Sequence, residues 1–187
     1  MSFVKLTRDG MTTRRRRILI NGAPNVWKTT ACLTAPRPLG ILSFPGEKGY
    51  DTIPHDDPGV LPFIWQLQDG KQPDSSQVVS DVIKTSMELV TGKHGEITSF
   101  VGDGLHKLIE YMLDDVTDGA WFTGQDFAPK LYALAYRKFE DYLSRVMHSQ
   151  IPVVIFTSWD DESPDRKVKS GERASDVPSS VRPDLPG

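Results

Sequence analysis

A glycine-led loop that ends in lysine and threonine is the segment of this chain best suited to bind phosphate. Gly22 and the pair Lys28-Thr29 stand at the offsets of the Walker A pattern, G-x-x-x-x-G-K-S/T. The apolar run Ile18-Leu19-Ile20 precedes the loop, and a helix-type segment begins at Lys28. In this strand-loop-helix context, backbone amides form a concave anion site. We predict that the nucleotide contacts are Gly22, Ala23, Pro24, Asn25, Val26, Trp27, Lys28, Thr29 and Thr30.

The second glycine of the pattern is replaced by Trp27. Glycine serves there because the backbone lies close to the phosphates and a Cβ crowds them. We therefore expect ordinary backbone angles at Trp27 and a side chain that points away from the nucleotide phosphates. Its ring would then pack over the base or ribose, or against a neighbouring subunit. The alternative is a strand-turn-helix joint that contains a chance lysine and threonine.

An aspartate directly after an apolar run is a candidate magnesium ligand. Asp103 follows the strand-type segment Ile97 to Val101, and Thr29 is the hydroxyl that the Walker A pattern assigns to the metal. A carboxylate on a neighbouring strand commonly completes such a site. We predict that Thr29 and Asp103 are the metal ligands for ATP-Mg. The alternative is that Asp103 caps a helix that begins at Leu105.

Hydrolysis needs a base that orients the attacking water, and Glu47 is the first candidate. It stands just past a second apolar segment, Leu39 to Phe44, which closes with Pro45-Gly46. We expect that strand to flank the phosphate loop, so that Glu47 and Lys28 are the catalytic residues. The alternative is a solvated loop glutamate beside Lys48.

Two hydroxyl residues, Thr157 and Ser158, come at the end of the last apolar segment. In a parallel sheet they reach the same edge as the phosphate loop. Either hydroxyl is placed to sense the γ-phosphate, and we include Ser158 among the nucleotide contacts. The alternative is that both satisfy local backbone groups.

Segments of strand character alternate along the chain with segments of helical period. The expected strands are 18–20, 39–44, 63–67, 97–101 and 151–157, and the expected helices are 28–33, 75–91, 105–113 and 129–148. The alternation predicts βαβ units and a doubly wound, mainly parallel sheet in one α/β domain over residues 1–187. Residues 1–13 are expected to be a lead-in arm, 121–129 an irregular insertion, and 160–187 a polar tail that suggests a truncated chain.

Composition limits where the protein acts. With 187 residues and a formal net charge of −3, the chain has no global basic field for nucleic acid. Its single cysteine, Cys32, excludes an internal disulfide and suits a reducing compartment. It shows no secretion signal and no apolar run near the roughly 18 residues that cross a bilayer. We expect a soluble, cytoplasmic protein without membrane contact.

Four segments together resemble the phage-encoded RecA-like ATPases of the AAA family, some of which act in single-strand annealing and recombination. The segments are 22–30, Ile41 to Glu47, Phe100 to Leu105, and Val153 to Ser158. The resemblance implies a RecA-like phosphate-loop fold in which Glu47 activates water and Thr157 or Ser158 couples nucleotide to a DNA-binding loop. It also implies ATP bound between subunits of a homo-oligomeric ring or filament, in the host-cell cytoplasm. No glutamate follows Asp103 directly, which favours Glu47 as the base.

Single-stranded DNA is the candidate macromolecular partner, because a basic groove with aromatic platforms suits it. Lys167, Lys169 and Arg173 follow the last strand, although the five acidic residues from Asp160 to Glu172 favour a solvated linker. The run Arg14 to Arg17 is an alternative contact for DNA, for a partner subunit or for solvent alone. Trp121, Phe122 and Phe127 are suited either to stack on bases or to pack against the core.

These observations favour ATP-Mg binding and ATP hydrolysis coupled to single-stranded DNA or to recombination. A non-hydrolysing, nucleotide-gated assembly protein is the alternative, because Trp27 disturbs the phosphate loop. A small-molecule kinase is less favoured, since no arginine-rich lid pattern is present.

Overall fold

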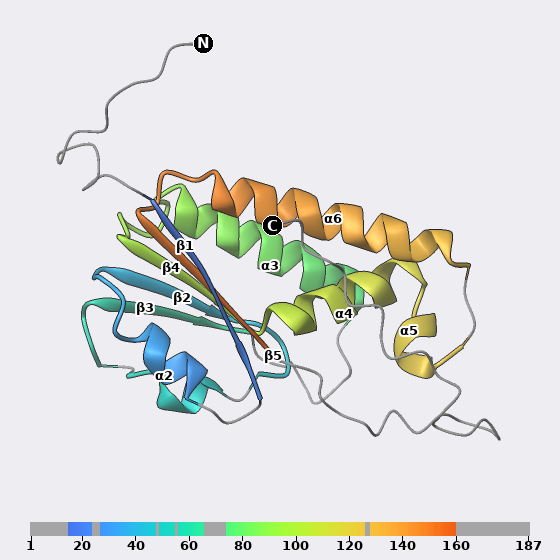
Figure 1. Cartoon of the computed structure of the whole chain (residues 1–187), viewed down its shortest axis with the longest axis horizontal. Coiled ribbons are helices and arrows are strands. Elements are labelled where there is room, and N and C mark those ends of the chain that lie inside the picture. The colour runs from blue at the N-terminus through green and yellow to red at the C-terminus, as the bar shows by residue number, and fades with distance from the viewer. Residues whose placement is uncertain are drawn as a thin grey trace, which may run out of the picture.

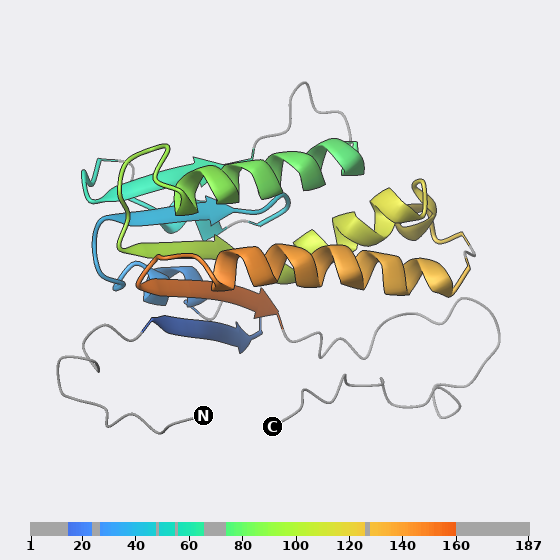
Figure 2. The ribbon, with the colours of Figure 1, turned by 90° about the horizontal axis from the view of Figure 1, so that it is seen from above.

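A parallel sheet forms the centre of the protein, for which a computed structural model describes residues 15–23, 27–47, 49–54, 56–65, 74–125 and 128–159. The strands are β1 (Arg16–Gly22), β2 (Leu39–Ser43), β3 (Val60–Ile64), β4 (Ser99–Asp103) and β5 (Val153–Trp159). They lie in the order β1-β5-β4-β2-β3, and every pair is parallel (Figure 2). The expected α/β class and parallel sheet are therefore confirmed.

Helices cover the two faces of this sheet unequally. The helices are α2 (Lys28–Cys32), η1 (Gly49–Thr52), α3 (Ser75–Val90), α4 (Leu105–Val116), α5 (Ala120–Thr123) and α6 (Lys130–Met147). Figure 1 shows α2 on one face and α3, α4 and α6 on the other. Each face has its own apolar core, a small one around Cys32 and a larger one around Tyr142.

The central strands are buried on both faces, as expected for parallel strands that lie between helical layers. All residues of β2 and of β4 are buried. The expected third strand, 63–67, was placed too late, because β3 occupies Val60–Ile64. Pro62 has no amide hydrogen, but β3 is an edge strand and tolerates that loss.

The longer helices agree closely with the periods seen in the sequence. The predictions 75–91 and 129–148 correspond to α3 and α6. The side chain of Asp74 caps α3 by accepting a hydrogen bond of 2.9 Å from the Ser76 amide. Residues 121–129, expected to be irregular, include part of the short helix α5. No helix within the described residues combines the length and the apolar character of a membrane span.

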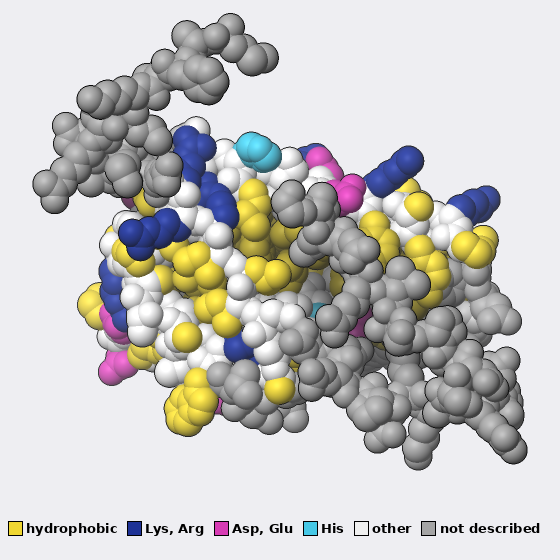
Figure 3. Space-filling view, in the orientation of Figure 1, with side chains coloured by type: hydrophobic (Ala, Val, Ile, Leu, Met, Phe, Trp, Pro, Cys, Tyr) yellow, Lys and Arg dark blue, Asp and Glu magenta, His cyan; other side chains and the backbone are white. Residues whose placement is uncertain are grey.

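Strand β1 forms one edge of the sheet and pairs with β5 alone. Leu19 is 54 % exposed, and apolar side chains gather along this edge in Figure 3. At the start of the strand, Arg17 donates hydrogen bonds to the carbonyls of Met147, Ser149 and Ile151. This arginine therefore anchors the connection from α6 to β5, at the end of β1 remote from the phosphate loop.

Candidate functional site

The carboxyl ends of the strands bring together residues that lie far apart in the sequence. The hydroxyl of Thr29, at the start of α2, donates to Asp103 Oδ2 at 2.8 Å. Asp103 is the last residue of β4 and is 2 % exposed. The Thr29 hydroxyl and the buried Asp103 carboxylate, the two predicted metal ligands, therefore lie within hydrogen-bonding distance of each other.

A second hydroxyl holds the other oxygen of the same carboxylate. Thr157 Oγ1 donates to Asp103 Oδ1 at 2.5 Å and accepts from the Gly104 amide at 2.9 Å. Because side chains alternate along β5, Ser158 faces the opposite side of the sheet. Thr157, rather than Ser158, is therefore the strand-end hydroxyl that joins the site. The Ser158 contact predicted for the nucleotide does not fit this orientation.

The alternative role of Asp103 as a helix cap is wrong. Gly104 is the N-cap residue of α4, and no side chain makes a capping hydrogen bond there. Gly104 adopts a φ of 98°, and a Cβ on it would fall 2.3 Å from Glu47 Cγ. Only glycine provides both this conformation and this space. The carboxylate of Asp103 remains directed at Thr29 and Thr157.

The ammonium group of Lys28 is folded back over its own loop. Its Nζ donates to the carbonyls of Gly22 at 2.8 Å and Ala23 at 2.7 Å, and the residue is buried. An ammonium group has three donors, so one remains for an anionic ligand. Thr30 lies half-buried one residue beyond Thr29 on α2. The predicted contacts Pro24, Asn25 and Val26 lie outside the described residues.

Trp27 departs from the expected ordinary backbone. Its φ of 61° and ψ of 20° are left-handed, and it is the N-cap residue of α2. The chain enters the helix through a turn that normally selects glycine, and the turn persists although a tryptophan stands there. The other half of the expectation agrees with the structure, because the residue is 77 % exposed and points outward.

Glu47 is buried, so its interpretation as a solvated loop residue is wrong. It is 8 % exposed and lies over Gly104. Burial, followed by the negative charge of Asp103, raises the pKa of Glu47 to about 7, while Lys107 and Lys28 act in the opposite direction. A carboxyl group with a pKa near neutrality is well matched to accepting a proton.

Strand β2, which we expected to flank the predicted phosphate loop, does not lie next to β1, the strand that leads into that loop. β5 and β4 both lie between β1 and β2, because β5 pairs with β1. Glu47 reaches the site through the turn after β2, in which its amide donates to the Phe44 carbonyl at 3.2 Å. The predicted meeting of Glu47 with the phosphate-loop residues therefore depends on this turn.

The sequence did not point to three further residues of the site. His106 Nε2 lies 3.2 Å from Glu47 Oε1, and its ring stacks on Trp159. Ser43 is the register partner of Asp103, so both side chains share one face of the sheet. Ser43 Oγ is buried without a hydrogen-bond partner among the described residues. His106 stands three residues after Asp103, and this spacing along one helix turn is the only signal the sequence offered.

No family model and no curated protein sequence matches this chain. The chemistry of the site must therefore be argued from its own residues.

The predicted DNA contacts fall into two groups. Lys167, Lys169, Arg173 and Phe127 lie outside the described residues. Trp121 and Phe122 pack edge-on against Tyr132 and Tyr111, respectively. Trp121 thus packs against the core, as the alternative interpretation proposed, whereas Phe122 is 39 % exposed beside Tyr111.

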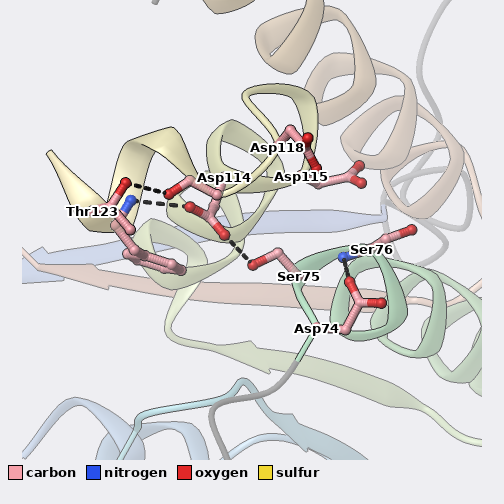
Figure 4. A pocket seen from close by; sticks show the side chains of 9 residues that line it. Asp74, Ser75, Ser76, Asp114, Asp115, Asp118 and Thr123 are labelled. Atoms are coloured by element: carbon pink, nitrogen blue, oxygen red, sulfur yellow. Dashed lines mark hydrogen bonds between the residues drawn. The ribbon is translucent and has the colours of Figure 1, made fainter. Parts of the chain in front are cut away.

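A separate acidic pocket of about 380 Å³ lies where α3 begins and α4 ends (Figure 4). Asp114 accepts hydrogen bonds from Ser75 at 2.6 Å and from the Phe122 amide at 3.0 Å. Asp115 pairs with Lys138 at 2.7 Å. These carboxylates are used within the fold, where they join α3, α4, α5 and α6.

Proposed function

We propose that this chain binds ATP-Mg at the carboxyl edge of its sheet, in the manner of a RecA-like phosphate-loop protein, and hydrolyses the ATP. One observation carries the proposal. The Thr29 hydroxyl lies 2.8 Å from the Asp103 carboxylate, while the Lys28 ammonium group belongs to the same loop and helix start. Ligands of open parallel α/β sheets bind at this edge.

The oxygen atoms at this edge suit magnesium. Mg²⁺ favours oxygen ligands and commonly uses one or two carboxylates together with substrate phosphates and water. Thr29 and Asp103 would hold it, and the buried, unpartnered Oγ of Ser43 is a further hydroxyl beside Asp103. No cluster of three acidic, histidine or cysteine ligands occurs among the described residues, so oxygens of phosphate and of water would complete the shell.

Space near Thr29 and Asp103 is kept by a glycine. A Cβ on Gly49 would fall 2.3 Å from Thr29 Oγ1 and 2.8 Å from Asp103 Oδ2. The backbone of η1 therefore approaches this oxygen pair as closely as its lack of a side chain permits.

Each residue has a distinct part in hydrolysis. Lys28 binds phosphate oxygens and offsets their negative charge. Glu47, buried beside Gly104, accepts a proton from the water that attacks the terminal phosphate. A bound magnesium ion would supply further neutralisation of phosphate charge. Thr157 fixes the carboxylate of Asp103 through its second oxygen.

A second function is favoured by Trp27. A left-handed tryptophan at the N-cap, 77 % exposed, presents a large apolar surface next to the phosphate loop. A nucleotide-gated assembly protein would use such a surface against a neighbouring subunit. It would bind ATP tightly, show negligible turnover and change its size with ATP, whereas a chain that stays monomeric with and without ATP on a sizing column would exclude it.

Steady-state ATP hydrolysis, with and without single-stranded DNA, tests the proposed function. Lys28→Ala serves as the blank, and Lys93→Ala is the matched control because Lys93 is an exposed lysine paired with Glu88. Turnover above the blank, kept in the control and raised by DNA, would support a DNA-coupled ATPase. No turnover on a sample that binds ATP would contradict hydrolysis and favour the assembly protein.

A further inference from the structure

His106 lies against the carboxyl group of Glu47 at the start of α4. The distance from His106 Nε2 to Glu47 Oε1 is 3.2 Å. Within the described part of the chain, both atoms are buried without a well-aligned hydrogen bond. A buried polar group that lacks a hydrogen-bond partner destabilises the structure around it. A small rotation that aligns these two atoms satisfies both of them at once.

Trp159 fixes the plane of this imidazole. The two rings stack with 4.4 Å between centroids and 27° between planes. Lys107 Nζ lies 5.5 Å from the centroid of the same indole and 2.9 Å from Glu110 Oε2. The end of β5 therefore contacts His106 through its ring face, while Glu47 contacts it at Nε2.

The contact is not an ion pair at neutral pH. Burial, followed by the positive charges of Lys107 and Lys28, lowers the pKa of His106 to about 4. A neutral imidazole that carries its proton on Nε2 donates one hydrogen bond without adding positive charge. A cation in that position would stabilise the ionised form of Glu47 and weaken it as a base. Histidine thus orients a carboxylate while preserving its basicity.

We infer that His106 is a positioning residue for Glu47, which it holds through Nε2 in the orientation that receives a proton from water. Trp159 supports the imidazole in this role. The inference rests on the proposed ATP hydrolysis and extends it, because it assigns the base a partner built from α4 and β5. His106 acts through Glu47 and does not itself touch the reacting atoms.

Steady-state hydrolysis by the full chain and its variants tests this role. We expect His106→Ala to lower kcat by ~10- to 100-fold and to leave KM for ATP within about threefold, as for other supporting groups. His106→Gln restores an amide donor near the Nε2 position, so it should recover most of the lost kcat. Trp159→Phe should retain activity, whereas Trp159→Ala should resemble His106→Ala.

His94→Ala is the matched control. His94 Nε2 lies 3.1 Å from Glu88 Oε2, a similar histidine-glutamate contact at the other end of the sheet. This variant should keep the wild-type kcat. Thermal unfolding of each variant identifies any that fail to fold, and His106→Gln then carries the comparison.

The outcomes separate this inference from the proposed function. Wild-type hydrolysis no greater than that of Lys28→Ala would overturn both. Wild-type hydrolysis with an equal kcat in His106→Ala would overturn the positioning role alone, as would a loss that glutamine does not recover. Combining His106→Ala with Glu47→Gln should add no further loss, since His106 acts through Glu47. An additional tenfold loss in the double variant would contradict the inference.

Discussion

The two halves of the candidate site lie on very different parts of the sheet. Asp103 and Glu47 come from β4 and from the turn after β2, and every residue of those two strands is buried. Lys28 and Thr29 follow β1, an edge strand that includes exposed Leu19 and leads to the exposed, left-handed Trp27. The acidic half lies in the core, whereas the half that we propose binds phosphate, called the phosphate-binding half below, lies at the edge of the sheet.

The two halves of the site differ in how firmly neighbouring groups hold their side chains. The carboxylates are held by buried neighbours, with Thr157 on Asp103 and His106 against Glu47, so they are arranged before any ligand arrives. Among the described residues, the Lys28 ammonium group bonds only to the carbonyls of Gly22 and Ala23 in its own loop. The phosphate-binding half should therefore depend more on the ligand for its final order than the acidic half does.

The largest expected effect falls on the acidic half. Glu47→Gln keeps the shape of the side chain but cannot accept a proton, so kcat should fall by ~10²- to 10⁴-fold. ATP affinity should change little, because Glu47 acts on water and does not bind phosphate. Kinetics and equilibrium binding on the same sample measure both quantities. Glu96→Gln, an exposed glutamate before β4, is the control. Equal hydrolysis by Glu47→Gln and the wild type would refute the base assignment.

Substitutions in β2 and in β1 should lower the free energy of unfolding by different amounts. Ile41 is fully buried in β2, and we expect Ile41→Ala to lower the free energy of unfolding by ~2–5 kcal/mol. Leu19 in β1 is 54 % exposed, so Leu19→Ala should cost less than about 1 kcal/mol. Denaturant unfolding of both variants measures the difference. Similar losses would show that β1 is as firmly built as the core.

Lys28→Ala should damage binding without damaging the fold. A lost hydrogen bond to a charged group costs about 1.5–3 kcal/mol, so ATP affinity should fall by ~10- to 100-fold. The unfolding free energy should change little, since within the described part of the chain the ammonium group bonds only to two loop carbonyls. Calorimetric titration with ATP and a thermal melt provide the two readings. An unaltered ATP affinity would show that Lys28 and its loop do not bind ATP.

The pH dependence of kcat/KM should follow the ionisation of the Glu47 carboxyl group. Burial raises its pKa to about 7, and a base must be ionised to accept a proton. Activity should therefore fall as pH drops below the raised pKa, by ~10-fold between pH 8 and pH 6. The residual activity of Glu47→Gln should lack this inflection. A wild-type profile that is flat over this range would contradict the buried-base account.

The smallest effect is expected at the margin of the site. Trp27→Gly relieves a left-handed tryptophan, and we expect about 1 kcal/mol of added stability. Tyr136→Gly is the matched control, because Tyr136 is an exposed aromatic within α6 and glycine should destabilise that helix by about 1 kcal/mol. Chemical denaturation measures whether each variant gains or loses stability relative to the wild type. Destabilisation by Trp27→Gly would mean that the indole makes contacts that offset its strain.

The sequence placed the candidate residues at one edge of the sheet more successfully than it predicted the strand order that brings them there. Motif offsets and strand ends pointed to Lys28, Thr29, Asp103 and Glu47, because parallel strands share a carboxyl edge. The sequence does not encode strand order in any local pattern, so the insertion of β5 between β1 and β4 was not anticipated.

Two other features of the site were not predicted from the sequence, each for a local reason. His106 joins the site through stacking on Trp159, a contact between segments about 50 residues apart that no spacing rule reveals. The backbone of Trp27 was expected to be ordinary because tryptophan rarely adopts a positive φ. In the structure, Trp27 nevertheless adopts a left-handed conformation as the N-cap residue of α2.

Equilibrium binding of ATP in magnesium and in EDTA, by the wild type, Lys28→Ala and Asp103→Asn, tests most directly whether the two halves form one site. The account predicts that magnesium strengthens binding to the wild type and that Asp103→Asn loses this gain. Lys28→Ala should weaken binding in both conditions. Equal ATP affinity of the wild type in magnesium and in EDTA would contradict a joint site. An Asp103→Asn variant that keeps the full magnesium effect would contradict it as well.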